Sequence, residues 1–237
     1  STCQLAPEQW HYLNHVRRIQ PGDSGELISQ DTQVLVKVLE LNESELCFEL
    51  LEHIEGSERQ NKPRIILYQA LPKQDKFSEI VRCCTEIGVM DYIPVISKRS
   101  VPKEVSNSKF TRWERIAESA ATQSQQYNLP RIWPTISLAE IPKHIENFPT
   151  DTLKLVPWED ATQDEYLSSV LKGRKNEWVI LFIGPEGGID PSEIEALSAA
   201  DFKAVSLGSS ILRVEHAAFY TAAALHYAYK SSERKDS

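Results

Sequence analysis

From residue 64 onward, short apolar runs alternate with segments of helical spacing, and this alternation constrains the fold more than any other feature of the chain. The apolar runs are predicted strands: Ile65–Ala70, Tyr92–Ser97, Leu153–Val156, Val179–Ile183 and Ala204–Leu207. Continuous apolar strands separated by helices are typical of a mostly parallel sheet that is covered on both faces. We therefore predict an α/β domain over residues 63–237.

Helix signals occupy the intervals between these strands. Apolar residues recur at helical spacing over Phe77–Ile87, and Gly88 suits the position just after a helix end. A second apolar face runs over Trp113–Ala121. The run Asp190–Glu193 combines an N-cap, a first-turn proline and a capping-box glutamate, so a helix is predicted to begin there. Val214–Lys230 is predicted to be a long, alanine-rich helix.

Residues 1–62 follow a different pattern, in which short β-forming runs are separated by turn signals. The predicted elements are a helix at Pro7–Val16 and strands at Glu26–Ile28, Gln33–Leu39 and Glu45–Leu51. The segment Glu55–Pro63 is polar and contains Gly and Pro, which is typical of a linker. We predict a small β-barrel over residues 1–62 that this linker joins to the larger domain.

The composition is that of an ordinary globular protein, with 41% apolar and 25% charged residues and a net charge of −8. This charge argues against a protein that coats nucleic acid non-specifically. Residues 71–135 are nevertheless basic, with 10 Lys and Arg against 7 Asp and Glu. A solvated surface is the simpler interpretation of this excess, and a local RNA-facing patch is the alternative.

The chain carries no sequence signal for a metal site, a disulfide framework or a membrane span. Its four cysteines form no C-x-x-C pair, and few histidines accompany them. The longest apolar run, Trp178–Ile183, is much shorter than the roughly 18 residues of a membrane-spanning helix. The first residues lack the pattern of a signal peptide. We expect a cytoplasmic protein that binds no metal and no membrane.

Two glycine-containing loops each follow a predicted strand and precede a predicted helix. They are Ile183–Ile189, which reads IGPEGGI, and Leu207–Arg213, which reads LGSSILR. Glycine lets a backbone turn tightly and approach a ligand, and ligands of open α/β sheets lie beyond the carboxyl ends of the strands. Neither loop matches a dinucleotide fingerprint or a P-loop, and the second does not match the hydrolase motif G-x-S-x-G.

These loops carry a family resemblance. The run Ile183–Gly188 followed by Ser192-Glu193-Ile194, and the pattern Leu207-Gly208-x-x-Ile211-Leu212-Arg213-x-Glu215, resemble the RsmE family of SPOUT-superfamily methyltransferases, which modify N3 of a uridine in 16S rRNA. Weaker matches lie upstream: Lys73, Glu86-Ile87-Gly88, Arg99, Gln123, His15–Arg18 and Pro21–Asp23.

The resemblance implies a fold, a cofactor and partners. The fold is a PUA-like β-barrel followed by a SPOUT α/β domain with a C-terminal trefoil knot. The cofactor is S-adenosyl-L-methionine, and the expected substrate is 16S rRNA within the assembled small ribosomal subunit. A homodimer is also implied, and the apolar face of the last helix is its predicted interface: Ala218, Ala222, Leu225 and Tyr229.

The resemblance also assigns site residues. Cofactor contacts are implied for three loops: Leu155, Val156 and Pro157; Ile183, Gly184, Pro185, Glu186, Gly187 and Gly188; and Leu207, Gly208, Ile211 and Leu212. RNA contacts are implied for Arg17, Arg18, Lys73, Arg99 and Gln123. Glu186 fits a turn carboxylate that accepts amide hydrogen bonds better than it fits a catalytic group.

Arg213 and Glu215 are the predicted catalytic residues. Methylation of uridine N3 requires loss of a weakly acidic proton, and negative charge then develops on O2 and O4. A guanidinium beside these oxygens stabilises the transition state more than the ground state, which suits Arg213. Glu215 is predicted to orient Arg213 or to assist proton removal. The alternative is an Arg–Glu surface pair at a helix start, which contributes little.

The chain departs from the family pattern at three places. Gln126 stands where an arginine is usual, Ser209-Ser210 replaces a common Pro-Arg, and His216 replaces Thr. The two missing basic residues slightly favour a non-catalytic RNA-binding or ribosome-assembly protein of the same fold, whereas the intact glycine loops favour an enzyme. A ribose 2′-O-methyltransferase is a second alternative. A dinucleotide oxidoreductase lacks the required fingerprint.

Overall fold

The structure, a computed structural model, describes residues 1–5, 7–29, 32–54, 63–124, 126, 128–161, 165–174 and 176–233. The chain forms two compact units, Ser1–Arg59 and Gln60–Ser237. The predicted linker Glu55–Pro63 lies outside the described residues, except for Pro63.

The first unit is an antiparallel four-stranded sheet in the order β1-β4-β3-β2. Its strands are β1 (Thr2–Gln4), β2 (Ser24–Ser29), β3 (Thr32–Leu41) and β4 (Glu45–His53). The predicted β-rich character is confirmed. Within the described residues β1 pairs with β4, β4 with β3 and β3 with β2, all antiparallel.

Two local features of this unit follow from its sequence. The predicted helix at Pro7–Val16 is present as α1 (Pro7–His11), which continues as the π-helical segment η1 (Tyr12–Val16). The turn between β3 and β4 is built by Asn42, whose side-chain oxygen accepts hydrogen bonds from the backbone amides of Ser44 and Glu45 at 3.1 and 2.9 Å. Asparagine favours such turns because its short side chain reaches its own backbone.

The second unit contains a seven-stranded parallel sheet in the order β11-β9-β10-β5-β6-β7, in which β8 also pairs with β6. Its strands are β5 (Arg64–Ala70), β6 (Asp91–Ile96), β7 (Arg131–Ile132), β8 (Ile136–Ser137), β9 (Leu153–Pro157), β10 (Trp178–Ile183) and β11 (Lys203–Val205). All five predicted strands are present. The sequence pattern missed β7 and β8 because each strand is only two residues long, which is too short to show a periodicity.

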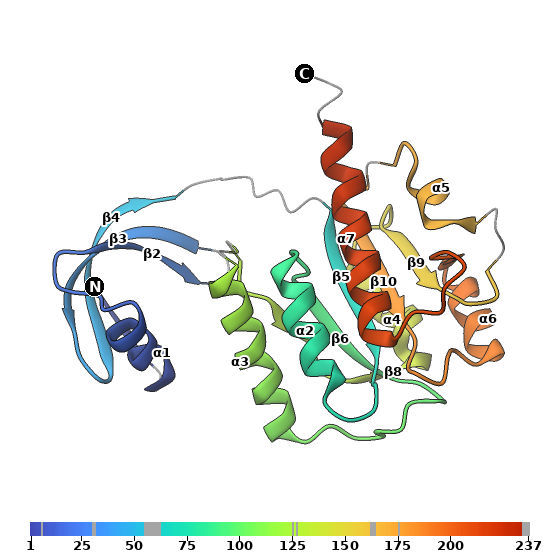
Figure 1. Cartoon of the computed structure of the whole chain (residues 1–237), viewed down its shortest axis with the longest axis horizontal. Coiled ribbons are helices and arrows are strands. Elements are labelled where there is room, and N and C mark those ends of the chain that lie inside the picture. The colour runs from blue at the N-terminus through green and yellow to red at the C-terminus, as the bar shows by residue number, and fades with distance from the viewer. Residues whose placement is uncertain are drawn as a thin grey trace. The chain divides into compact units, whose positions relative to one another are not determined.

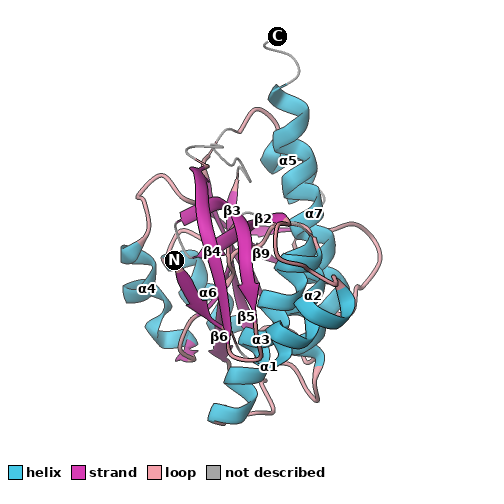
Figure 2. Cartoon of the chain, turned by 90° about the vertical axis from the view of Figure 1, so that its left-hand side faces the viewer, coloured by secondary structure: helices cyan, strands magenta, loops and turns pink. Residues whose placement is uncertain are grey.

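Helices cover both faces of this sheet (Figures 1 and 2). They are α2 (Lys76–Glu86), α3 (Asn107–Gln123), α4 (Ile141–His144), α5 (Leu167–Leu171), α6 (Pro191–Ala199) and α7 (Val214–Glu233), with 3-10 turns at Leu138–Glu140 and Ile145–Asn147 beside α4. Successive side chains of β5 enter opposite cores: Ile65 and Leu67 pack with α2, α3 and α7, whereas Ile66 and Tyr68 pack with α4 and α6. The predicted two-sided burial is confirmed.

Helix ends follow the predicted signals. Asp190 caps α6, since its side chain accepts from the amide of Ser192 and Glu193 completes the capping box. Gly88 has a φ of 101°, a conformation that suits glycine just after α2. The knotted chain path that the resemblance implies stays a prediction.

The predicted dimer face of α7 is wrong. Ala218, Ala222 and Leu225 have no exposed surface and Tyr229 is 5% exposed, because this face packs into the core of its own unit. Helical periodicity identified an apolar face but could not tell which surface covers it.

A polar contact in the core on the α4 side of the sheet predicts how stability depends on pH. The Tyr68 hydroxyl and Nδ1 of His144 lie 2.6 Å apart, and burial lowers the pKa of His144 below its ordinary value of 6.5. Between the lowered and the ordinary pKa, the unfolded chain binds more protons than the folded protein, so stability falls as the pH drops below about 6.5.

We expect the His144→Gln variant to lose less unfolding free energy than the wild type between pH 7 and pH 5. Urea unfolding at the two pH values measures this difference. The control is His53→Gln, which alters an exposed histidine of β4. The same pH dependence in His144→Gln and the wild type would contradict the assignment.

Candidate functional site

A cavity of about 440 Å³ opens where the segments that follow β9, β10 and β11 meet. Its lining comes from Lys76, 157–159, 183–186, Gly188, Ile189, 206–214 and Ala217. The three strands are parallel and near neighbours in the sheet, so their carboxyl ends reach the same edge. Cavities of about 300–1,000 Å³ suit small-molecule ligands.

Ten of the thirteen predicted cofactor residues line this cavity, and three do not. Leu155 and Val156 are 0% and 1% exposed, because alternate side chains of β9 point into the two cores. Gly187 lies outside the lining, and its carbonyl accepts a hydrogen bond from Arg99 Nη1 at 2.8 Å. These three residues do not line the cavity, and their predicted contact with the cofactor stays a prediction.

Glu186 lies in the loop between β10 and α6 (residues 184–190, called the β10 loop) and connects it to the region where α2 begins. Its two carboxylate oxygens both accept from the backbone amide of Lys73 at 3.1 Å, and Oε1 lies 3.2 Å from the Lys76 ammonium. Burial alone would raise the pKa of Glu186, but backbone amide donors and the Lys76 ammonium outweigh it and lower the pKa. Glu186 is thus a turn carboxylate that accepts amide hydrogen bonds, as the sequence indicated.

Lys76 is a cavity residue that the sequence reasoning missed. Its ammonium lies 3.2 Å from Glu186 and 3.5 Å from Oε2 of Glu215, and it therefore joins the β10 loop to the start of α7. The hydrogen bond to Glu186 is the main cause that raises the pKa of Lys76. A signal was available, because Lys76 begins the helix that follows a predicted buried strand.

The two predicted catalytic residues have different surroundings. Glu215 is 9% exposed and its ion-pair partner is Lys76, not Arg213. Arg213 is exposed, lines the cavity, and makes no ion pair with any residue that the structure describes. The predicted orientation of Arg213 by Glu215 is corrected accordingly, and the Arg213 guanidinium is accessible to a ligand.

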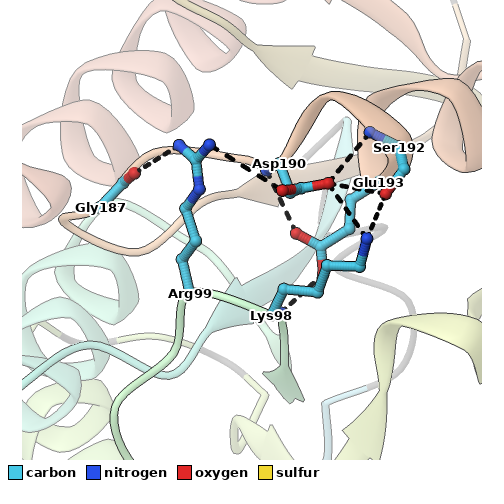
Figure 3. A network of polar contacts seen from close by, with 6 residues as sticks. All are labelled: Lys98, Arg99, Gly187, Asp190, Ser192 and Glu193. Carbon is cyan, nitrogen blue, oxygen red and sulfur yellow. Dashed lines mark hydrogen bonds and ion pairs between the residues drawn. The ribbon is translucent and has the colours of Figure 1, made fainter.

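Lys98 and Arg99, which follow β6, bind the β10 loop and the first turn of α6 (Figure 3). Arg99 donates to the Gly187 carbonyl, and its Nη2 lies 3.9 Å from Oδ2 of Asp190. The backbone amide of Lys98 donates to Glu193 at 2.7 Å, and its ammonium lies 3.1 Å from Asp190. Hydrogen bonds from Ser192 and Lys98 lower the pKa of Asp190 to about 2. Arg99, predicted to contact RNA, thus has an intramolecular role in shaping the loop.

The remaining predicted RNA contacts are divided between the two units. Arg17 and Arg18 are exposed in the first unit. Lys73 and Gln123 are exposed in the second unit, shortly before α2 and at the end of α3. Among the described residues, no group of His, Cys, Asp and Glu is large enough to hold a metal ion, and no described helix is long and apolar enough to cross a membrane.

Comparison with known proteins places the chain in a family. Residues 59–226 match the model of the RNA methyltransferase domain. The chain is 28% identical over 236 residues to ribosomal RNA small subunit methyltransferase E of Bacillus subtilis, covering 95% of this chain and 90% of the relative. The relative from Synechocystis is 33% identical over 216 residues, covering 90% of this chain and 69% of its own length.

A solved structure agrees with these relatives. The structure resembles ribosomal RNA small subunit methyltransferase E from Neisseria gonorrhoeae bound to S-adenosyl methionine, with a TM-score of 0.80, 25% identity, and 96% and 92% of the two chains covered. Fold and site thus define an α/β protein with a glycine-lined ligand cavity at the carboxyl edge of a parallel sheet. The chain belongs to the RsmE family of RNA methyltransferases, as its motifs predicted.

The close packing of Gly184 generates a stability prediction. A Cβ at this position would lie 2.6 Å from Cγ1 of Ile189, so the β10 loop would have to shift. We expect Gly184→Ala to lower the free energy of unfolding by about 1–3 kcal/mol, as overpacked sites do. Urea denaturation measures the loss.

Gly187→Ala is the matched control in the same loop, because its Cβ would meet Arg99 at an ordinary 3.4 Å. We expect this variant to stay within about 0.5 kcal/mol of the wild type. Equal stability losses in the two variants would show that the contact with Ile189 is not the cause.

Proposed function

We propose that the protein is an S-adenosylmethionine-dependent methyltransferase that acts in the cytoplasm on N3 of a uridine in 16S rRNA, uridine 1498 in bacterial numbering. The observation that carries this proposal is the three-loop cavity with an accessible guanidinium at its edge, in a chain of the RsmE family. The small ribosomal subunit is the proposed substrate particle.

The cavity fits the cofactor. Gly188 and Gly208 line the cavity with φ values of 73° and 116°, a backbone conformation that suits glycine, and neither adds a side chain between its backbone and the cavity. Ile211 is 89% exposed at the cavity, a large apolar surface that a bound adenosyl group would cover. When bound, S-adenosylmethionine supplies an electrophilic methyl group.

The chain's own residues then orient the uridine and stabilise charge. We assign to Arg213 a hydrogen bond to the uracil oxygen on which negative charge develops, because Arg213 lines the cavity, is exposed and has no ion-pair partner among the described residues. Lys76 lines the cavity, and its ammonium lies 3.5 Å from Oε2 of Glu215, so it holds this carboxylate at the start of α7. Positioning is the dominant contribution expected for an in-line transfer.

The first experiment identifies the product. The protein is incubated with radiolabelled S-adenosylmethionine and unmodified small subunits, and the RNA is digested to nucleosides. We expect the label in 3-methyluridine. Label in a 2′-O-methylated nucleoside would instead support ribose methylation, and cofactor binding without label would point to a changed RNA target. Absence of both would leave the non-catalytic RNA-binding alternative.

Replacement of Arg213 tests its role in the transition state. We expect Arg213→Ala to lower kcat about 10²- to 10³-fold, the cost typical of losing one preorganised donor, while the affinity for S-adenosylmethionine stays near the wild-type value. Arg213→Lys should recover only part of the rate, because an ammonium cannot form the two-pronged contact. The control Lys143→Ala removes an exposed cation on α4. An unchanged kcat in Arg213→Ala would refute the role.

We further propose that the protein is a homodimer that pairs through the outward face of α7. Phe219, Tyr220 and Tyr227 are 41%, 51% and 77% exposed on this helix, an unusual concentration of aromatic surface. Light scattering at micromolar concentration should give twice the chain mass. Tyr220→Glu combined with Tyr227→Glu should give the monomer mass with the far-UV circular dichroism retained. A wild-type monomer would contradict the proposal.

A further inference from the structure

We propose that a groove between α2 and α3 binds the phosphodiester backbone of the substrate RNA beside the target nucleotide. This inference rests on the proposed function. The groove has a volume of about 470 Å³ and is separate from the cofactor cavity. Its polar lining consists of Arg82 and Glu86 from α2 and Arg112, Arg115, Ser119 and Gln123 from α3.

The α3 side of the groove is a continuous polar edge. Arg112, Arg115, Ser119 and Gln123 are three or four residues apart, so they follow one another along a single face of the helix. At about 1.5 Å per residue they extend over roughly 16 Å, which accommodates several consecutive nucleotides. Their hydroxyl, amide and guanidinium groups can all donate to phosphate oxygens.

The charge of the groove favours an anion. Three guanidinium groups face it, against the single carboxylate of Glu86. Arginine binds phosphate through two parallel hydrogen bonds, which makes it the side chain best suited to this ligand. The groove also lies in the basic part of an acidic chain, between residues 71 and 135.

The existing ion pairs of these arginines are easy to exchange. Arg82 Nη1 lies 3.0 Å from Glu86 Oε1, and Arg112 Nη2 lies 2.5 Å from Asp75 Oδ2. The four side chains are 41–61% exposed, and exposed pairs contribute only about 0–1 kcal/mol. An incoming phosphate can therefore replace these partners at little cost, whereas Arg99 donates to the Gly187 carbonyl of the β10 loop.

One end of the groove lies next to the cofactor cavity. Asp75, the partner of Arg112, directly precedes Lys76, which lines that cavity. Helices α2 and α3 lie side by side (Figure 1), and the groove follows them away from this point toward Glu86 and Gln123. An RNA strand whose uridine enters the cavity can place its neighbouring phosphates along the groove.

The test combines Arg82→Gln with Arg112→Gln and measures binding to 16S rRNA and to small subunits as a function of salt. We expect at least a tenfold loss of affinity for both at physiological salt. The slope of log affinity against log salt should fall by about 1.4 to 1.8, the value for two lost phosphate contacts. The KM for subunits should rise while kcat and cofactor affinity stay near the wild-type values.

Two control proteins keep the proposal falsifiable. Lys143→Gln with Lys172→Gln removes the same charge from exposed positions elsewhere, and an equal loss of affinity there would show a general charge effect and overturn the proposal. Arg82→Lys with Arg112→Lys retains the charge and should keep the salt slope. Circular dichroism of the double-glutamine variant reveals any folding defect from losing the pair with Asp75.

The measurements distinguish failure of the groove proposal from failure of the proposed function. Unchanged RNA affinity and salt slope in an active double-glutamine variant would overturn the groove alone. Weaker binding to subunits with unchanged binding to protein-free 16S rRNA would assign the groove to a protein partner and also overturn it. A wild-type protein that transfers no methyl group would end the proposed function, while the RNA-binding measurement would still decide the groove.

Discussion

The parallel pairing of β10 between β9 and β5 is the constraint on which the rest of the structure depends. Ile180, Leu181 and Phe182 are fully buried, so β10 can be stable only with a covered sheet face on either side. Because β9 and β11 run parallel to it, the loops that leave all three strands gather at one edge. The cavity is a consequence of this arrangement, since the loops cannot fill the edge that they share.

The cationic side chains fall into two groups, those that stabilise the loops of the site and those that are available at the surface. Lys76 and Arg99 are engaged with Glu186, Glu215, Asp190 and the Gly187 carbonyl, and together they fix the β10 loop against α2 and α7. Arg213 and the arginines of the α2–α3 groove are exposed. An acidic protein can therefore present cations to a ligand, because Arg213 has no ion-pair partner among the described residues and the ion pairs of Arg82 and Arg112 are exposed to solvent.

Sequence reasoning succeeded where the signal was long or chemically specific. The buried strands, the capping box at Asp190 and the glycine after α2 were all predicted from local rules. It failed where a partner distant in sequence decides the outcome. Arg99 contacts a loop 88 residues away, and Glu215 pairs with Lys76 and not with its neighbour Arg213. No periodicity encodes such a pairing.

The sequence by itself determined the α/β alternation, the glycine loops and the family, because apolar spacing and backbone freedom are properties of neighbouring residues. The tertiary structure decided which cations are available to a ligand, which face of α7 is covered and where the lining of the cavity ends. Leu155 and Val156 illustrate this difference. Their position before Pro157 is given by the sequence, whereas their burial is set by the two cores that pack against β9. Ion pairs and burial depend on distances in space, and folding fixes these distances only when the whole sheet has formed.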